Sequence, residues 1–481
     1  MKTWFQRALA AGLLACACAV RAEPAAAESR ALSLEEAIAQ ALAHNRDLVK
    51  GALDLQAYRV AAERARETAR GIRIGPAGSA QAGSAAENWR AGLGAEATGA
   101  YGTRIAAAAA AGQIEVDGAP AQRRGEVRVD VEQPLFRNFG PLVQNEPIVA
   151  ANENWLAARR AWERDRSALV VAVAEQYEGL ILLRHQIESD EAFAARMERL
   201  YALASAREQQ GKAARTETMR MDLQRGEAAL RLETGRSELG VRFQEFADLL
   251  GLPLEAAFRL TPPALLDLDV ARTAGALAVA LAERPDYAQA LQDVETGERQ
   301  LRLAQRKLLP DLRLSAGQTT YGEGPDWSDA RRLDENDWFV GLAADMDLNL
   351  RGARLDVARA GLDAEAGRQV VEIVRSRLAV EVNSGVAAYR RTRAALELAG
   401  RNHELAANRA ELARALFEAG RASADSVSDA EADLIAAQLG ELAARRDASV
   451  SAYRLLHVLG TLLPVPPELL RPDQKGSTHE S

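Results

Sequence analysis

Two long stretches that lack helix-breaking residues constrain this chain more than any other feature. Between Leu142 and Ala204 the only glycine is Gly179 and the only proline is Pro147. One helix over these residues would be about 90 Å long at 1.5 Å per residue, which is longer than a globular core can bury. Apolar residues recur along it every seven positions, which is typical of a coiled-coil seam. They form one row at Ile148, Trp155, Trp162 and Leu169 and a second at Val173, Leu180 and Ile187.

The same arrangement of helices occurs twice in the chain. In each copy a glycine breaks the helical run, and a second glycine ends it. Gly211 and Gly420 are 209 residues apart, and so are Gly251 and Gly460. A constant offset between two landmarks predicts an internal duplication. We expect helices over residues 142–204 and 215–250 in the first copy and 356–418 and 426–459 in the second, each preceded by a leading helix, over 34–68 and 274–308.

These landmarks divide the chain into five predicted segments. A signal peptide covers residues 1–22, and the last residues form a loose tail. The two structural repeats lie between them and are joined by a linker that contains Pro253, Pro262 and Pro263. The predicted bounds are 32–252 for the first repeat, 253–272 for the linker, 273–462 for the second repeat and 463–481 for the tail.

Composition and motifs exclude several functional classes. The 68 acidic residues outnumber the 60 basic ones and give a formal net charge of -8, whereas a nucleic-acid-binding protein usually has a basic excess. The five histidines are too widely spaced for a local metal site, so we predict neither a metal nor another cofactor. The sequence has no phosphate-binding loop, nucleophile elbow or zinc signature. We therefore predict that the chain is not an enzyme.

The N-terminus has the features of an export signal. Lys2 and Arg7 precede an apolar run over residues 8–20, and Val20-Arg21-Ala22 supplies a small-residue cleavage site. An alternative interpretation takes Leu13-Leu14-Ala15-Cys16 as a lipobox-like stretch, in which Cys16 would be acylated and become the new N-terminus. Both interpretations predict an exported protein. Beyond residue 20 no window is apolar enough for a membrane-spanning helix, so any membrane contact must use strands or a lipid.

Glycine-rich stretches between the leading and long helices alternate with a period of two. Val127, Val129 and Val131 face one way, while Arg128, Asp130 and Glu132 face the other. Residues 340–348 repeat the pattern, and weaker strands are expected at 93–101 and 312–318. Ionised groups on one face are typical of a water-filled lumen, although a half-buried soluble strand would alternate too. The nearby aromatic residues form either an interfacial girdle or ordinary core packing: Trp89, Tyr101, Phe136, Phe139, Tyr321, Trp327, Trp338 and Phe339.

The number of strands predicts that several copies share one barrel. Four strands, two near residues 93–133 and two near 312–348, cannot close a membrane barrel, because an open edge in lipid leaves backbone groups unpaired. Two copies would give eight strands, a number at which side chains fill the interior, whereas three would give twelve and leave room for a pore. A pore therefore favours at least a trimer.

Several short motifs occur in the same order in both repeats. In the first repeat they are Leu32-Ser33-Leu34-Glu35-Glu36-Ala37, Asn45-Arg46-Asp47-Leu48, Gln133-Pro134-Leu135-Phe136-Arg137-Asn138-Phe139-Gly140 and Asn145-Glu146-Pro147-Ile148. In the second repeat they are Arg284-Pro285-Asp286-Tyr287, Leu308-Leu309-Pro310-Asp311-Leu312 and Gly420-Arg421-Ala422-Ser423. With these motifs the chain resembles the TolC-like outer membrane efflux proteins over residues 32–462.

The resemblance implies a mainly α-helical protein with membrane β-strands. In this family a homotrimer forms a twelve-stranded outer-membrane barrel that continues as an α-helical barrel in the periplasm of a Gram-negative bacterium. The expected function is passive conduction of substrates in a tripartite efflux or type I secretion system. The expected partners are a periplasmic adaptor and an inner-membrane pump, together with outer-membrane lipid. The alternative is a soluble periplasmic coiled-coil adaptor or scaffold, which would explain the helical hairpins but not the charged, alternating strands.

The resemblance also assigns roles to the two hairpin turns. It implies that the segments after Gly211 and Gly420 contact the adaptor, although they also fit plain turns between helices. The implied contact residues are Gly211, Lys212, Thr216, Thr218, Gly420, Arg421, Ser423 and Val427. The implied periplasmic gate is formed by Asp425, Ser426 and Asp429, where only Asp429 matches an acidic ring of the family, and a solvated charge in the first helical turn would explain it equally well.

Overall fold

A computed structural model describes residues 30–463, except 83–85, 117–119, 212–213, 257, 267, 269–274, 420 and 422–423. The predicted signal peptide, Cys16 and most of the predicted tail lie outside these residues. The chain divides into two compact units, each assembled from three separate segments. Unit 1 contains residues 30–45, 172–265 and 401–446, and unit 2 contains residues 46–171, 266–400 and 447–463. The long helices α5, α10 and α11 pass from one unit into the other.

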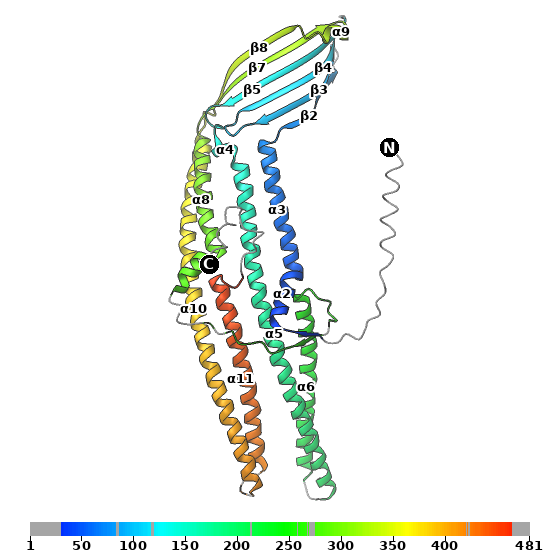
Figure 1. Cartoon of the computed structure of the whole chain (residues 1–481), viewed down its shortest axis with the longest axis vertical. Coiled ribbons are helices and arrows are strands. Elements are labelled where there is room, and N and C mark those ends of the chain that lie inside the picture. Colours follow the sequence, from blue (N-terminus) through cyan, green and yellow to red (C-terminus); the bar gives the residue numbers. More distant parts are fainter. Residues whose placement is uncertain are drawn as a thin grey trace, which may run out of the picture. The chain divides into compact units, whose positions relative to one another are not determined.

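Unit 2 contains one antiparallel sheet of six strands, in the order β2-β3-β4-β5-β7-β8 (Figure 1). Four of them come from the first repeat and two from the second. The expectation of four strands per chain, two in each repeat, was therefore wrong. The strands are β2 (Arg73–Ala82), β3 (Ala86–Thr98), β4 (Arg104–Val116), β5 (Gln122–Pro134), β7 (Asp311–Gly324) and β8 (Glu335–Asp345).

The sequence of β4 explains why the alternation pattern does not predict that strand. Residues 106–111 are all alanine, the residue with the highest helix propensity and a low frequency in strands. Because the same small side chain points to both faces, no alternation is visible. Strand β2 is similarly poor in large residues. It nevertheless pairs with β3 over its full length, from Arg73 opposite Glu96 to Ala82 opposite Glu87.

Four helices of unit 2 form a row beneath the sheet, in the order α3 (Arg46–Arg70), α5 (Glu146–Gln209), α8 (Pro285–Arg306) and α10 (Arg351–Glu418). Trp162 of α5 donates a hydrogen bond from Nε1 to the carbonyl oxygen of Leu48 in α3, at 3.2 Å. Val374 and the fully buried Leu378 of α10 pack against Ala290 of α8. Short α4 (Pro141–Gln144) and α9 (Trp327–Ala330) belong to the loops.

Each leading helix is broken once, contrary to the expectation of one continuous helix. In the first repeat α2 (Leu34–His44) ends at Asn45, whose ψ of 128° is not helical. In the second, α7 (Ala276–Glu283) ends at Arg284, whose ψ is 122°. Pro285 accounts for the second break, because a proline disfavours the helical conformation in the residue before it. Ser33 is the N-cap of α2, and Ser33 and Glu36 form a reciprocal capping box.

Unit 1 packs its core around two aromatic side chains. Tyr177 of α5 and Phe246 of α6 (Arg215–Leu249) are fully buried, with ring centroids 6.1 Å apart. The Tyr177 hydroxyl lies 2.7 Å from the carbonyl oxygen of Leu32 and accepts a hydrogen bond from the Thr261 N–H at 3.0 Å. It thus joins the ends of β1 (Arg30–Leu32) and β6 (Phe258–Leu260), which pair in parallel.

The two repeats end with the same glycine conformation. Gly251 follows α6 with φ +70°, and Gly460 follows α11 (Ala424–Leu459) with φ +77°. After Gly251, the N–H of Leu252 donates to the carbonyl oxygen of Ala247 at 2.8 Å, and after Gly460 the N–H of Thr461 donates to that of Leu456 at 3.1 Å. A side chain is disfavoured at this φ, so both glycines are required where the helices end.

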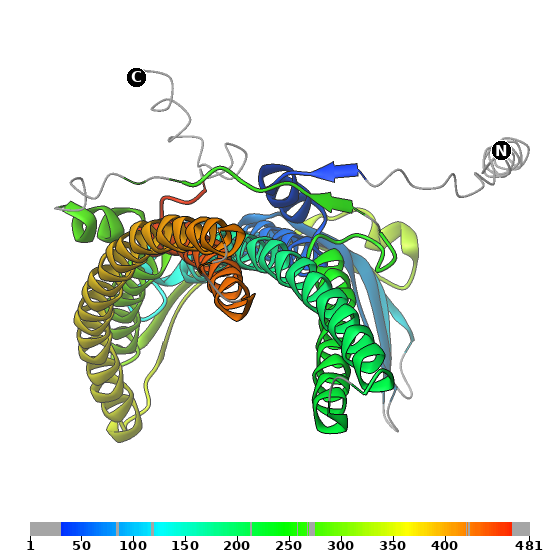
Figure 2. The same cartoon turned by 90° about the horizontal axis from the view of Figure 1, so that it is seen from below.

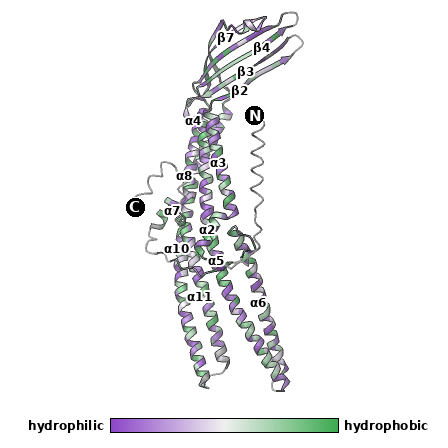
Figure 3. Ribbon diagram, turned by 45° about the vertical axis from the view of Figure 1, so that its right-hand side comes forward, coloured by the Kyte–Doolittle hydropathy of each residue, from purple (hydrophilic) through white to green (hydrophobic). Residues whose placement is uncertain are grey.

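The hydropathy of the helices is mixed throughout (Figure 3). Within the described residues, no helix combines the length and apolar character needed to cross a membrane.

Candidate functional site

The sheet of unit 2 has one polar face, and ion pairs run across it from strand to strand. On this face the Glu96 carboxylate of β3 lies 3.2 Å from Arg73 of β2 and 2.5 Å from Arg104 of β4. The Glu126 carboxylate of β5 lies 2.8 Å from Arg90 of β3 and 3.2 Å from Arg124 of its own strand. The face is therefore charged but locally neutralised, and its charged side chains come from both repeats.

Small residues in β4 allow the ion pair between Arg90 and Glu126 to form across that strand. Arg90 and Glu126 lie on β3 and β5, with β4 between them. On this face β4 presents Gly112 beside Arg90 and Ala110 beside Glu126. A Cβ at Gly112 would lie 3.2 Å from the Cβ of Arg90, which is closer than most such contacts. The glycine and alanines of β4 thus leave room for a guanidinium to cross the strand.

The opposite face of the same sheet is apolar and exposed. Leu93 of β3 is 64% exposed, Val129 of β5 44% and Leu342 of β8 65%. Exposed apolar surface of this extent marks contact with a membrane or with another protein. The register places apolar side chains on this face in all six strands. They include Ile74, Leu93, Ile105, Val127, Val129, Val131, Leu314, Val340 and Leu342.

Aromatic residues lie at both ends of the strands. At the loop end, the rings of Trp89 and Trp327 are 5.9 Å apart. At the helix end, those of Tyr101 and Phe139 are 5.7 Å apart. A membrane girdle has aromatic residues at two levels, and this arrangement fits one. The interpretation of these residues as an interfacial girdle stays a prediction.

The first hairpin turn lies in unit 1, between α5 and α6. Gly211 has φ +70°, and its N–H donates to the carbonyl oxygen of Glu208 at 2.8 Å. Thr216 is exposed in the first turn of α6, whereas Thr218 is buried. Lys212 lies outside the described residues. The described part of this turn thus presents Gly211 and Thr216 to solvent, and a role in adaptor contact stays a prediction.

The second hairpin turn lies in unit 1 between α10 and α11. Arg421 is exposed, and its N–H donates to the carbonyl oxygen of Leu416 at 2.8 Å. Ser426 and Asp429 are exposed in the first turns of α11. Asp425 and Val427 lie in the same helix, but their side chains are outside the described part, as are Gly420 and Ser423. The predicted gate residues are therefore on one helix end, and their function as a gate stays a prediction.

An ion-pair cluster near these turns was not found from the sequence. Glu431 of α11 lies 3.3 Å from Arg414 of α10 and 3.7 Å from Arg196 of α5. It therefore connects the two helical hairpins of one chain within unit 1. Figure 2 shows each hairpin as a pair of neighbouring helices. No sequence pattern identified this contact, because its three residues are far apart in the chain.

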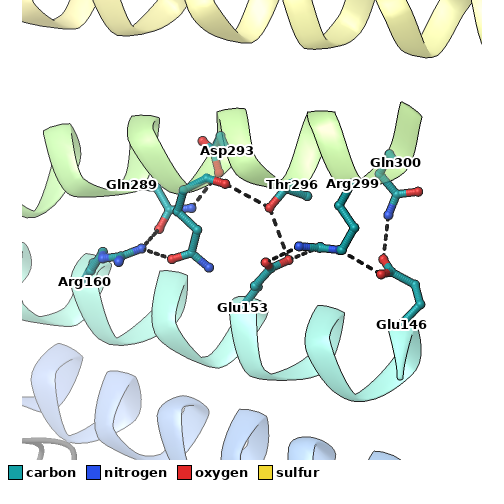
Figure 4. Close-up of polar contacts among 9 residues, drawn as sticks. Glu146, Glu153, Arg160, Gln289, Asp293, Thr296, Arg299 and Gln300 are labelled. Carbon is teal, nitrogen blue, oxygen red and sulfur yellow. Dashed lines mark hydrogen bonds and ion pairs between the residues drawn. The ribbon is translucent and has the colours of Figure 1, made fainter. Parts of the chain in front are cut away.

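A polar seam joins α5 to α8 in unit 2 (Figure 4). The Arg299 guanidinium of α8 contacts the carboxylates of both Glu146, at 2.8 Å, and Glu153, at 2.6 Å. These hydrogen bonds and charges raise the pKa of Arg299 against the opposing effect of burial. Two turns further along α5, Arg160 donates hydrogen bonds to the side-chain oxygen of Gln289, at 2.7 Å, and to that of Gln292. Glu146, Glu153 and Arg160 are spaced by seven residues, so this side of α5 has a polar heptad row beside its apolar ones.

His457 lies in a half-enclosed cavity of about 360 Å³ in unit 2. Its Nδ1 is 2.7 Å from the Ser167 hydroxyl. Burial lowers the pKa of His457 below its ordinary value, and the positive charge of Arg284 lowers it further, whereas Glu381 and Asp286 act in the opposite direction. The pKa of Asp286 is also lowered, because its hydrogen bond and ion pair with Arg284 outweigh its burial. The cavity therefore favours a neutral His457.

Unit 2 should lose stability as the pH falls through the ordinary histidine range. Because the folded pKa of His457 is depressed, the unfolded chain binds this proton first, starting near pH 6.5, and the loss is complete below the folded pKa. We expect the thermal midpoint of the wild-type protein to fall between pH 7.5 and pH 5.5, and His457→Gln to reduce this fall. Identical profiles for wild type and His457→Gln would contradict the prediction.

In the part of the chain that the structure describes, no group of three or more His, Cys, Asp or Glu side chains could hold a metal ion. The expectations of no cofactor and no catalytic activity stay predictions.

Comparisons with known proteins agree with these observations. Residues 276–461 match the family described as outer membrane efflux protein. A comparison with curated protein sequences gives no match. Three solved structures with this fold are the outer membrane protein VceC from Vibrio cholerae, the CmeC outer membrane channel from Campylobacter jejuni and the open MtrE outer membrane channel from Neisseria gonorrhoeae.

The similarity to these structures covers nearly the whole chain but is distant in sequence. VceC is 17% identical with a TM-score of 0.65, CmeC 13% with 0.68, and MtrE 16% with 0.61. Each match covers 89% of this chain and, in the same order, 96%, 86% and 89% of the other. The second repeat therefore matches the outer membrane efflux protein family, and the chain as a whole shares the fold of these outer-membrane channels.

Proposed function

We propose that the chain is the outer-membrane channel of a tripartite efflux or type I secretion system, through which substrates pass passively from the periplasm to the outside. The observation that carries the proposal is the two-faced sheet. Its apolar face suits lipid, and its ion-paired face suits a water-filled lumen. A soluble adaptor would have no use for an exposed apolar sheet face.

Several copies must assemble for such a channel to close. The sheet has two free edges, at β2 and β8, and free edges are not stable in lipid. The helical row has two outer members, α3 and α10, and both expose apolar residues every seven positions. Leu53 and Val60 of α3 are 60% and 61% exposed, and Leu355 and Leu362 of α10 are 63% and 73% exposed. These heptad rows supply the contacts between neighbouring copies, and we assign three copies as in the family.

The periplasmic ends would be the two hairpin turns, with an adaptor docked on the exposed residues around Gly211 and Arg421 and with Asp429 in the gate. Energy would come from a pump in the inner membrane. The chain's own contribution is the ion-paired face of its sheet. Glu431 would hold the two hairpins of one chain together at the closed end through Arg196 and Arg414.

Reconstitution in a planar lipid bilayer tests this function. The purified full-length protein should form threefold particles in detergent and should conduct ions across the bilayer. A water-soluble monomer that does not insert or conduct would overturn the proposal. A photo-reactive residue at Thr216 or Arg421 should capture the adaptor in cells, whereas one at the exposed Leu230, farther along α6, should not.

A further inference from the structure

We propose that the barrel of this protein has eighteen strands, six from each of three copies, rather than the twelve implied by the family resemblance. The inference rests on the proposed function for the number of copies. The number of strands per copy comes from the sheet itself, where β2, β3, β4, β5, β7 and β8 form one uninterrupted ladder. Two of these strands, β3 and β4, have no counterpart in the second repeat.

The spacing of the repeats locates the additional segment. Gly251 and Gly460, at the ends of the repeats, are 209 residues apart, whereas Arg46 and Pro285, which begin the equivalent helices α3 and α8, are 239 apart. The first repeat is therefore 30 residues longer between these points. The hairpin from Ala86 to Val116, which comprises β3 and β4, has 31 residues. The additional hairpin thus accounts for the whole difference in length.

This hairpin is built into the sheet on both faces. On the polar face, Glu96 and Arg90 connect it to Arg73 of β2 and to Glu126 of β5. On the apolar face, Leu93 and Ile105 continue the exposed surface. Its turn is fixed as well, because Gly102, at φ +89°, would place a Cβ 2.7 Å from Pro134. The hairpin is therefore part of the wall and not a loop laid over it.

Six strands also match the helices below them in width. Strands about 4.8 Å apart and tilted by about 40° occupy roughly 6 Å of circumference each, so six cover about 38 Å. Four helices packed about 10 Å apart cover about 40 Å. A ring of three copies would then have a strand barrel roughly 36 Å across, compared with roughly 24 Å for twelve strands. Such a barrel leaves a porin-sized channel.

The strand directions allow this ring to close without a defect. Every neighbouring pair in the sheet is antiparallel, and the number of strands is even, so β8 of one copy meets β2 of the next in antiparallel orientation. The occupant of each free edge is therefore a second copy of this chain.

Two measurements on the full-length protein test the inference. In a cryo-electron microscopy map, eighteen strands around a threefold axis would support it. Twelve strands, either from two copies or from three copies with β3 and β4 outside the wall, would overturn it. If the protein with twelve strands still conducts ions, the proposed function survives and only the strand number is wrong. If it neither assembles nor conducts, the proposed function fails.

Disulfide trapping provides the second measurement. Ser79→Cys in β2 is combined, in separate variants, with Asp337→Cys, Phe339→Cys, Gly341→Cys or Ala343→Cys in β8, all on the polar face. We expect at least one pair to give a covalent trimer on a non-reducing gel. Ala108→Cys in the interior strand β4, combined with the same four, should give none. Trapping by Ala108→Cys but not by Ser79→Cys would overturn the inference.

Discussion

Arg299→Met should lower the stability of unit 2 by about 3 kcal/mol or more. The substitution leaves the Glu146 and Glu153 carboxylates without their shared counter-ion, and removing one partner of a buried ion pair costs roughly 3–5 kcal/mol. The three side chains are only 12%, 18% and 19% exposed, so solvent cannot replace the lost contacts. The measurement is the midpoint of thermal loss of helical circular dichroism in detergent, compared with wild type.

Two further variants separate the charge from the packing in this seam. The triple variant that adds Glu146→Gln and Glu153→Gln to Arg299→Met should recover much of the loss, because no unpaired charge remains. Gln300→Met removes only the 2.7 Å hydrogen bond to Glu146 at the exposed rim, and it should cost less than 1 kcal/mol. If Arg299→Met is no more harmful than Gln300→Met, the seam does not stabilise the contact between α5 and α8.

The helices were predictable from sequence because their signals are local and repeated many times. An interval without glycine or proline and a heptad row extend over dozens of residues, so α5, α6, α10 and α11 appear close to their expected bounds. The breaks at Asn45 and Arg284 were missed. At Asn45 the signal is tertiary, since its side-chain Nδ2 donates to the carbonyl oxygen of Leu249, 204 residues away. At Arg284 the following Pro285 was a local signal that could have been used.

The sheet was only half predictable. The period-two alternation of the sequence predicted β5 and β8, where apolar and polar residues alternate. It failed for β4, where the alanines 106–111 hide the same geometry. In the fold the alternation is visible in the exposure of these alanines. Ala107, Ala109 and Ala111 are exposed, whereas Ala106, Ala108 and Ala110 are half-buried. A strand whose role is to leave space, as β4 does for Arg90, carries no pattern of its own.

The same strand allows the most direct test of which sheet face meets lipid. Ala109 lies on the apolar face between Leu93 and Val127, whereas Ala106 lies on the polar face between Glu96 and Asp130. Ala109→Lys places a charge in the lipid-facing band and should cost roughly 2–4 kcal/mol per chain. Ala106→Lys adds the same residue to the same strand between two carboxylates, and it should be neutral or mildly stabilising.

The readout is the amount of folded oligomer in outer membranes and its resistance to dissociation by heat in detergent. Because each copy carries the substitution, the cost of Ala109→Lys applies once per chain and should nearly abolish the assembled form, while Ala106→Lys should assemble like wild type. Ala109→Ser tests whether any change at this position is harmful, and it should be tolerated because it adds no charge. Equal loss with lysine at both positions would show that crowding, rather than lipid, decides the outcome. Selective loss with Ala106→Lys would mean that the face with Glu96 and Asp130 is the one that meets lipid.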